Sequence, residues 1–156
     1  MADSSVLVRE ARPQDELQIR SILDETISGS LDATVHNIVS IRQNVHENVD
    51  LWLTRHAEIL HLVAEQAGEL AGVLLIKDYR VMCSLFVRPK FQRKGIGSAL
   101  VRHALHACKE KSPGTVLRLF ANNDAIAFYE ALGFEVKALK KPAPAGSTVM
   151  FFNKMN

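Results

Sequence analysis

The sequence predicts an α/β sandwich in which helices pack on a mostly antiparallel sheet. The apolar segments change between helical and strand-like spacing, in the order strand, two helices, three strands, helix, strand, helix and two strands. Apolar runs at 59–66 and 70–76 are separated only by Ala67-Gly68-Glu69, which suits an antiparallel hairpin. The 156 residues, 47% of them hydrophobic, suffice for one sizeable core, so residues 1–156 are expected to form a single domain.

The first part of the chain predicts one strand and two helices. Residues 6–9 form a short apolar run that favours a strand. Pro13, followed by Asp15 and Glu16, is typical of a helix start, because acidic side chains favour the positive end of a helix. Apolar residues recur at helical spacing before Gly29, at Leu17, Ile19, Ile22, Leu23 and Ile27. A second, less regular helical pattern comprises Val35, Ile38, Val39, Val45, Val49 and Trp52.

The rest of the chain predicts strands around two further helices. After the hairpin, the apolar run 81–87 should end near Pro89, which cannot donate to a sheet ladder. A helix follows Gly95 and Gly97, and its apolar face comprises Leu100, Val101, Ala104, Leu105 and Cys108. The remaining expectations are a strand over 115–120, a helix over 125–132 closed by Gly133, strands over 135–139 and 148–153, and an exposed loop over 140–146.

Composition and charge limit the expected partners. The chain has 19 Lys and Arg against 17 Asp and Glu, a formal net charge of +2, which gives no electrostatic reason to expect a nucleic-acid partner. No apolar run approaches the length of about 18 residues that suggests a membrane span, and residues 1–10 lack the pattern of a secretory signal. Cys83 and Cys108 have no metal-ligand or redox spacing. A cytoplasmic protein with free thiols is therefore expected.

The segment 85–100 predicts a phosphate site, because a strand runs through a basic, glycine-bearing turn into a helix. The first N–H groups of a helix have no partner within it and lie at its positive end, so they can donate to an anion. Gly95 and Gly97 lack a Cβ and let the backbone approach a ligand closely. Arg93 and Lys94 add positive charge.

Two common nucleotide-binding motifs do not match this turn. A P-loop has the pattern Gly-x-x-x-x-Gly-Lys-Ser/Thr, whereas here Lys94 precedes Gly95. A dinucleotide fingerprint has the pattern Gly-x-Gly-x-x-Gly, and Leu100 stands where its last glycine should be.

A different family matches the turn. Gln92-Arg93-Lys94-Gly95-Ile96-Gly97 resembles the Q/R-x-x-G-x-G/A signature of the GNAT superfamily of N-acetyltransferases, in which this turn binds the pyrophosphate of coenzyme A. The stretch from Asn122 to Phe134 is similar to the family's N-x-x-A-x-x-F-Y-x-x-x-G-F segment. The resemblance covers nearly the whole chain. It implies a three-layer sandwich, a twisted sheet of about six to seven strands with helices on both faces, and acetyl-CoA as cosubstrate without a metal.

The resemblance also implies which residues contact the coenzyme. The pantetheine arm would lie against the backbone of Leu85, Phe86 and Val87, in a strand that is bulged and splayed from its neighbour in the family. The pyrophosphate would lie against Gln92, Arg93, Lys94, Gly95, Ile96, Gly97 and Ser98. Asn122 matches a position whose amide commonly contacts the coenzyme.

Tyr129 is the expected catalytic residue. Its place in the second motif implies a phenol near the thioester sulfur, where it can protonate or hydrogen-bond the leaving thiolate. Taken without the motif, Phe128 and Tyr129 would be explained as core aromatics of a short helix.

The general base is not assigned. Many GNAT enzymes carry a glutamate on the strand that corresponds to 81–87, near Cys83, but this strand has no carboxylate. Either an amine of lowered pKa binds already neutral, or water relays its proton to Glu65, Tyr79, a histidine or a backbone carbonyl.

Other reactive residues have simpler explanations. Cys83 is expected to be a small apolar residue rather than an acyl carrier. His103 and His106 lack a carboxylate or third ligand at suitable spacing, so no metal site is predicted. Lys140 and Lys141 suit a solvated loop.

The predicted function is acetyl transfer from acetyl-CoA to a primary amine of a small molecule, peptide or protein. The alternative is a non-catalytic acyl-CoA-binding regulatory module, which the strand without a carboxylate keeps open. The resemblance implies an acceptor groove near 24–35 and 140–147, where Asp24, Glu25 and Asp32 are candidates for attracting a cationic amine. A homodimer and acyl groups other than acetyl also stay open at this point.

Overall fold

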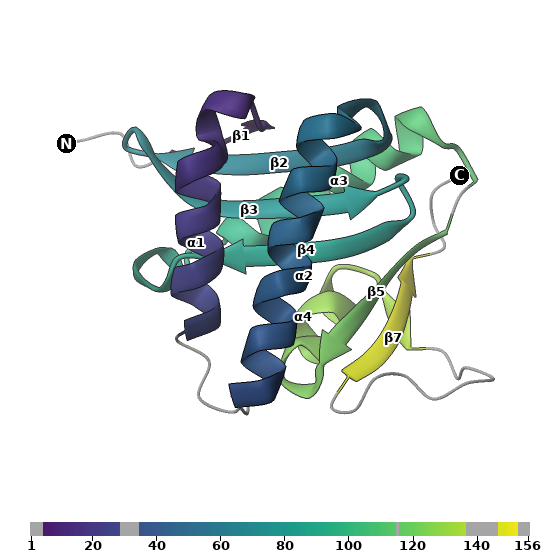
Figure 1. Ribbon diagram of the computed structural model, residues 1–156. Helices are drawn as coiled ribbons and strands as arrows, with labels where there is room; N and C mark the ends of the chain where they lie inside the picture. Colours follow the sequence, from purple (N-terminus) through teal and green to yellow (C-terminus); the bar gives the residue numbers. More distant parts are fainter. Residues whose placement is uncertain (1–4, 29–34, 115, 137–146, 153–156) are drawn as a thin grey trace.

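The fold is a single sheet with helices on both faces (Figure 1). The computed structural model describes residues 5–28, 35–114, 116–136 and 147–152. Seven strands of this part of the chain form the sheet, in the order β1-β2-β3-β4-β5-β7-β6. They are β1 Leu7–Glu10, β2 Ile59–Gln66, β3 Glu69–Lys77, β4 Val81–Val87, β5 Leu117–Asn122, β6 Glu135–Val136 and β7 Ser147–Phe152. All neighbours are antiparallel except β4 and β5, which confirms the predicted fold class.

Two pairs of helices cover the two faces of the sheet. The helices are α1 Glu16–Ser28, α2 Val35–Thr54, α3 Ile96–Lys111 and α4 Ile126–Ala131. Helices α1 and α2 lie in front of the sheet in Figure 1, and α3 lies behind it. Ile22, Trp52 and Val73 belong to the core on the α1–α2 face. Leu100, Leu74 and Leu119 belong to the core on the α3–α4 face.

The two cores differ in extent. On the α3–α4 face, buried residues come from β2 to β5 and from β7. In the hydrophobic core on the α1–α2 face, the buried strand residues are those of β2 and β3, with Cys83 and Phe86 of β4 partly buried beside them. Phe120 of β5 is 46% exposed, so the α1–α2 side of β5 is only partly covered.

The helix patterns locate the elements better than they identify every buried residue. The first helix begins after a 3-10 turn at Pro13–Asp15, where the Asp15 carboxylate accepts a hydrogen bond from the Arg12 N–H at 2.8 Å. Leu17, predicted to lie on the apolar face, is 83% exposed because it stands about 200° around the helix from Ile19. Val39 of the second helix is likewise exposed.

The hairpin between β2 and β3 has the predicted position and a shorter turn. Ala67 and Gly68 have φ values of 54° and 77°, the left-handed conformation that a two-residue hairpin turn requires at both central positions. Gln66 pairs with Glu69, so Glu69 already belongs to β3.

The last strands differ from their predicted bounds. Strand β5 begins at Leu117 rather than at residue 115, which lies outside the described residues. Strand β6 comprises Glu135–Val136, and the rest of the predicted strand 135–139 and the predicted loop 140–146 lie outside the described residues.

Strands β4 and β5 meet over a short distance and then separate. Val81 pairs with Arg118 and Met82 pairs with Leu119, and these are the pairs that join the two strands. Opposite β3, Leu75 pairs with Ser84 but Ile76 pairs with Met82, so Cys83 is an extra residue that bulges out of the ladder. The bulge therefore directly follows the last residue pair between β4 and β5, and the predicted bulge and splay are both present.

Among the described residues, no helix combines the length and the apolar character that a membrane crossing needs.

Candidate functional site

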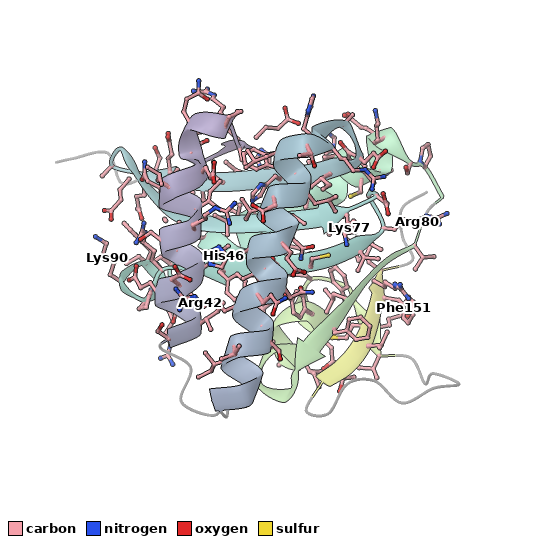
Figure 2. The ribbon with its side chains drawn as sticks, viewed as in Figure 1. Arg42, His46, Lys77, Arg80, Lys90 and Phe151 are labelled. Atoms are coloured by element: carbon pink, nitrogen blue, oxygen red, sulfur yellow. The ribbon has the colours of Figure 1, made fainter. Side chains whose placement is uncertain are left out.

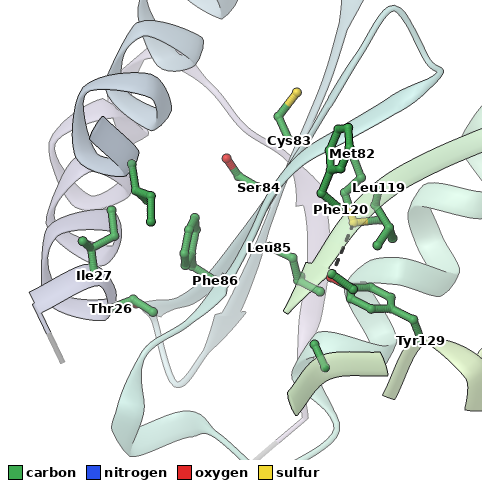
Figure 3. A pocket seen from close by; sticks show the side chains of 13 residues that line it. Thr26, Ile27, Met82, Cys83, Ser84, Leu85, Phe86, Leu119, Phe120 and Tyr129 are labelled. Atoms are coloured by element: carbon green, nitrogen blue, oxygen red, sulfur yellow. Dashed lines mark hydrogen bonds between the residues drawn. The ribbon is translucent and has the colours of Figure 1, made fainter. Parts of the chain in front are cut away.

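A cavity of about 410 Å³ lies where β4 and β5 separate (Figure 3). It reaches from helices α1 and α2 on one side to α4 on the other. Its lining residues are Thr26, Ile27, Ile41, Met82, Cys83, Ser84, Leu85, Phe86, Leu119, Phe120, Ala121, Ala125 and Tyr129. Apart from the hydroxyls of Thr26, Ser84 and Tyr129 and the thiol of Cys83, these side chains are apolar.

The edge of β4 that faces this cavity offers backbone groups to a ligand. The Arg88 N–H donates to the Ala71 carbonyl of β3 at 2.8 Å. Because successive residues of a strand direct their hydrogen-bonding groups to opposite sides, the N–H and C=O of Leu85 and Val87 point away from β3. The Val87 carbonyl accepts from the Gln92 side-chain amide at 3.0 Å.

The turn after β4 ends in an open helix N-terminus. Arg93 and Gly95 have φ values of 62° and 81°, so the chain bends through two left-handed residues. The Ala99 N–H donates to the Gly95 carbonyl at 3.0 Å and closes the first helical turn. The N–H groups of residues 96–98 precede this bond and have no acceptor within α3. They lie at the positive end of a 16-residue helix, where an anion is stabilised.

Tyr129 lies at the α4 side of the cavity. Its ring makes edge contacts with Phe128 and Phe134, at centroid distances of 5.0 and 5.5 Å. Its hydroxyl donates to the Met82 sulfur at 4.0 Å, the dashed line in Figure 3. Burial raises the pKa of Tyr129 to about 12, so the phenol keeps its proton at neutral pH. A protonated phenol beside a strand edge is a proton donor.

Comparison with known proteins agrees with this geometry. The family model described as acetyltransferase (GNAT) domain matches residues 27–144. The chain belongs to the GNAT acetyltransferase family.

Two curated relatives of this GNAT chain come from Escherichia coli strain K12. The peptidyl-lysine N-acetyltransferase YiaC is 36% identical over 75 residues, covering 47% of this chain and 49% of that protein. The ribosomal protein bS18-alanine N-acetyltransferase is 30% identical over 87 residues, covering 53% of this chain and 59% of that protein. The chain thus spans about half the length of the curated relatives it matches.

Solved structures share the whole fold at low sequence identity. The PaiA N-acetyltransferase from Thermoplasma acidophilum, in complex with coenzyme A, has a TM-score of 0.74 at 19% identity and covers 96% of this chain and 99% of its own. A GNAT acetyltransferase from Brucella melitensis, in complex with acetyl-CoA, has a TM-score of 0.68 at 22% identity, with coverages of 94% and 96%.

The structure brings most of the predicted site residues of this GNAT chain together. Leu85 and Phe86 line the cavity. Val87 lies beside Gly97, because a Cβ added to Gly97 would be 3.9 Å from the Val87 Cγ2 atom. The predicted pyrophosphate residues form the turn and the start of α3, with Gln92, Arg93, Lys94 and Gly95 exposed, Ile96 buried, and Gly97 and Ser98 partly buried. Asn122 ends β5 opposite Ser147.

The residues named for a proton relay do not line the cavity. Glu65 pairs with Arg9, at 2.9 Å between carboxylate and guanidinium. Tyr79 packs on the α3–α4 core, and the Lys111 ammonium lies 5.9 Å from the centre of its ring. Among the described lining residues, the groups that titrate are Cys83 and Tyr129. Burial raises the pKa of the Cys83 thiol, which agrees with the predicted structural role.

The two histidines of α3 that were considered as metal ligands are exposed. His103 faces solvent, and His106 lies 3.1 Å from the Glu110 carboxylate on the same helix. No group of three or more His, Cys, Asp or Glu residues within the described ranges is arranged to hold a metal.

The α1–α2 wall of the cavity was predicted in part. Thr26 and Ile27 fall within the acceptor groove expected near 24–35, whereas Ile41 of α2, which also lines the cavity, was not named. Ile41 is 44% exposed although it is apolar, and this combination appears only in three dimensions. The hydrogen bond between Gln92 and Val87 also has no sequence signal.

Proposed function

We propose that this GNAT chain transfers the acetyl group of acetyl-CoA to a primary amine by direct attack of the amine on the thioester. The family match and the solved relatives that contain coenzyme A or acetyl-CoA support the cosubstrate. The site suits it chemically. A strand edge with outward N–H and C=O groups fits the amide-bearing pantetheine arm, and an open helix N-terminus fits a pyrophosphate.

The residues of the turn fit this role in detail. A Cβ added at Gly95 would meet nothing within 4 Å, so this glycine is required by its φ of +81° and leaves space beside it. A Cβ at Gly97 would lie 3.4 Å from the Phe128 ring. In the proposal, Leu85, Phe86 and Val87 bind pantetheine, residues 92–98 bind the pyrophosphate, and Asn122 contacts the coenzyme.

Tyr129 is the proposed catalytic acid. Acetyl-CoA supplies an activated acetyl thioester. As the carbon–nitrogen bond forms and the carbon–sulfur bond breaks, the phenol gives its proton to the departing sulfur. The amine loses its proton to solvent, and a proton from solvent restores the phenol. The observation that carries the assignment is a buried phenol, held protonated, in the cavity beside the splayed strand.

The test compares two tyrosines. Free thiol is measured with acetyl-CoA and a panel of amines and peptides, for wild type, Tyr129→Phe and Tyr79→Phe. Tyr79 is the chain's other tyrosine and does not line the cavity. We expect Tyr129→Phe to lower kcat by about 10²–10⁴-fold, the usual contribution of a general acid, with coenzyme binding retained, and Tyr79→Phe to stay near wild type.

Other outcomes identify the alternatives. Thermal stabilisation by coenzyme A without thiol release for any amine would indicate the acyl-CoA-binding regulatory module. Absence of coenzyme binding would refute the proposal as a whole.

The proposal places the reaction in the cytoplasm, in keeping with free thiols at Cys83 and Cys108. It treats residues 1–156 as one domain. A homodimer stays a prediction that light scattering would test.

A further inference from the structure

The α1–α2 wall of the cavity is apolar where an acceptor would approach. Ile27 and Ile41 contribute aliphatic side chains to the lining. Phe86 of β4 faces Ile27 (Figure 3). The Thr26 hydroxyl donates to the Ile22 carbonyl of its own helix at 2.8 Å, so its hydrogen is already used. Ile41 and Phe120 are 44% and 46% exposed, which leaves apolar surface available at this site.

The carboxylates predicted to attract a cationic amine are occupied by cations of the protein. One Asp24 oxygen lies 2.9 Å from the Arg42 guanidinium and 2.8 Å from the His46 ring, on helix α2 (Figure 2). Glu25 pairs with Arg88 at 2.5 Å. None of these groups lines the cavity. Asp32 lies outside the described residues.

The cavity favours uncharged forms of the groups that it contains. None of the described residues that line it carries a carboxylate that could pair with an ammonium group. Burial also raises the pKa of the Tyr129 phenol and of the Cys83 thiol. The same loss of hydration acts on an amine and favours the neutral amine, which is also the form that attacks a thioester.

Amines differ widely in how easily they become neutral. The α-amine of a peptide has a pKa of about 7.7–8.0, and a lysine ε-amine has one of about 10.4. At neutral pH the neutral fraction of the α-amine is therefore about 300-fold larger, from the difference of about 2.5 pKa units. A site that favours neutral forms accepts the α-amine at much smaller cost.

Resting on the proposed function, we infer that the acceptor is the N-terminal α-amine of a peptide chain whose first residue is uncharged and apolar. Ile27, Ile41 and Phe86 would contact the first side chain, and the amine would reach the thioester beside Tyr129.

Two matched peptides test the acceptor class. One has a free N-terminal alanine and no lysine, and the other has the same length, an acetylated N-terminus and a single internal lysine. We expect kcat/KM from thiol release at neutral pH to be at least about 100-fold higher for the first peptide, in line with the larger neutral fraction. Equal or faster reaction of the lysine peptide would overturn the inference. So would release with other small amines but with neither peptide, although the proposed function would then stand. Release with no amine would contradict the proposed function itself.

A pair of variants on α2 tests the wall. Ile41→Asp places a carboxylate at the cavity, and Val39→Asp places one on the same helix at a residue that is 58% exposed and does not line the cavity. Both positions are exposed, so both variants should fold. The readout is the ratio of kcat/KM for a peptide that begins with lysine to kcat/KM for one that begins with alanine. Ile41→Asp should raise this ratio by about 10-fold, which corresponds to about 1.4 kcal/mol. Val39→Asp should leave it unchanged. An unchanged ratio in Ile41→Asp would contradict the placement of the first side chain.

Discussion

The Tyr129 hydroxyl donates to the Met82 sulfur across the gap between α4 and β4, at 4.0 Å. This contact fixes the phenol at the point where β4 leaves β5, because Met82 is the last β4 residue paired with β5. A thioether is a weak acceptor, so the phenol can exchange this partner for a stronger one.

Replacing Met82 by leucine should separate positioning from packing. The swap nearly conserves volume and should cost less than about 1.5 kcal/mol in unfolding free energy. Loss of a hydrogen bond worth about 0.5–1.5 kcal/mol should lower kcat for thiol release by about 2- to 10-fold. Met150→Leu, in the same buried core, is the control and should leave kcat unchanged. Identical kcat values in both variants would mean that the sulfur does not orient Tyr129.

Alanine substitutions at two glycines of the same backbone conformation distinguish the effect of backbone strain from the effect on coenzyme binding. Gly95 and Gly68 have φ values of +81° and +77°, and a Cβ at either would meet nothing within 4 Å. Substitution by alanine should cost each about 1–2 kcal/mol, measured by urea unfolding, since L-residues avoid this conformation. Only Gly95→Ala should weaken coenzyme A binding, measured by calorimetry. Equal affinities in the two variants would argue against a pyrophosphate at this turn.

The ionisation of Tyr129 can be observed directly. The chain has 2 tyrosines, so Tyr79→Phe leaves Tyr129 as the one that titrates. Ultraviolet absorbance should show phenolate forming near pH 12, because burial raises the pKa of Tyr129 to about 12 from its ordinary value of 10.0. The phenol should therefore act as a proton donor throughout the neutral and mildly alkaline range. Titration near pH 10 would show that the phenol is hydrated.

A buried histidine predicts acid sensitivity. His61 is 4% exposed, its Nδ1 has no hydrogen-bond partner in the described part of the chain, and burial lowers its pKa to about 4 from 6.5. Between these values the unfolded state binds more protons than the folded state, so stability falls as pH falls from about 6.5 to 4. From pH 7 to pH 5 this amounts to about 2 kcal/mol.

Urea unfolding at the two pH values checks this expectation. His61→Leu should remove the histidine's share of the loss, since it replaces an unsatisfied ring against Trp52 by an apolar side chain. His103→Leu, at an exposed position, should keep it. A pH dependence that is the same in both variants would assign the acid sensitivity to other groups.

Local patterns were sufficient to predict most helices and strands, and they also predicted the turn before α3 and the position of Tyr129. The helix after Gly95 and the hairpin at Ala67-Gly68 follow from residues close in sequence, and both are confirmed. The motif around Tyr129 predicted a residue that lies in the cavity. Roles of the individual site residues stay predictions.

Features that depend on contacts between distant segments could not be predicted. The exposure of Leu17 depends on which residues of α1 meet the sheet, and the apolar pattern alone assigned it to the core. Asp24 and Glu25 looked available because Arg42 and Arg88 are distant in sequence. The cavity lies beside Cys83, the extra residue in β4, and a register shift leaves no trace in local composition.

The two residue pairs between β4 and β5 also have a mechanical consequence. Strands on both sides of these pairs, β2–β4 and β5 with β7, contribute buried residues to the hydrophobic core on the α3–α4 face, whereas the strand residues buried in the hydrophobic core on the opposite face belong to β2 and β3. The two parts of the sheet are thus joined by these two residue pairs and by the hydrophobic core on one face. A ligand that binds between β4 and β5 would contact both parts of the sheet and restrict their relative motion. Amide hydrogen exchange in β5 should therefore slow down on binding, even at residues that the ligand does not touch.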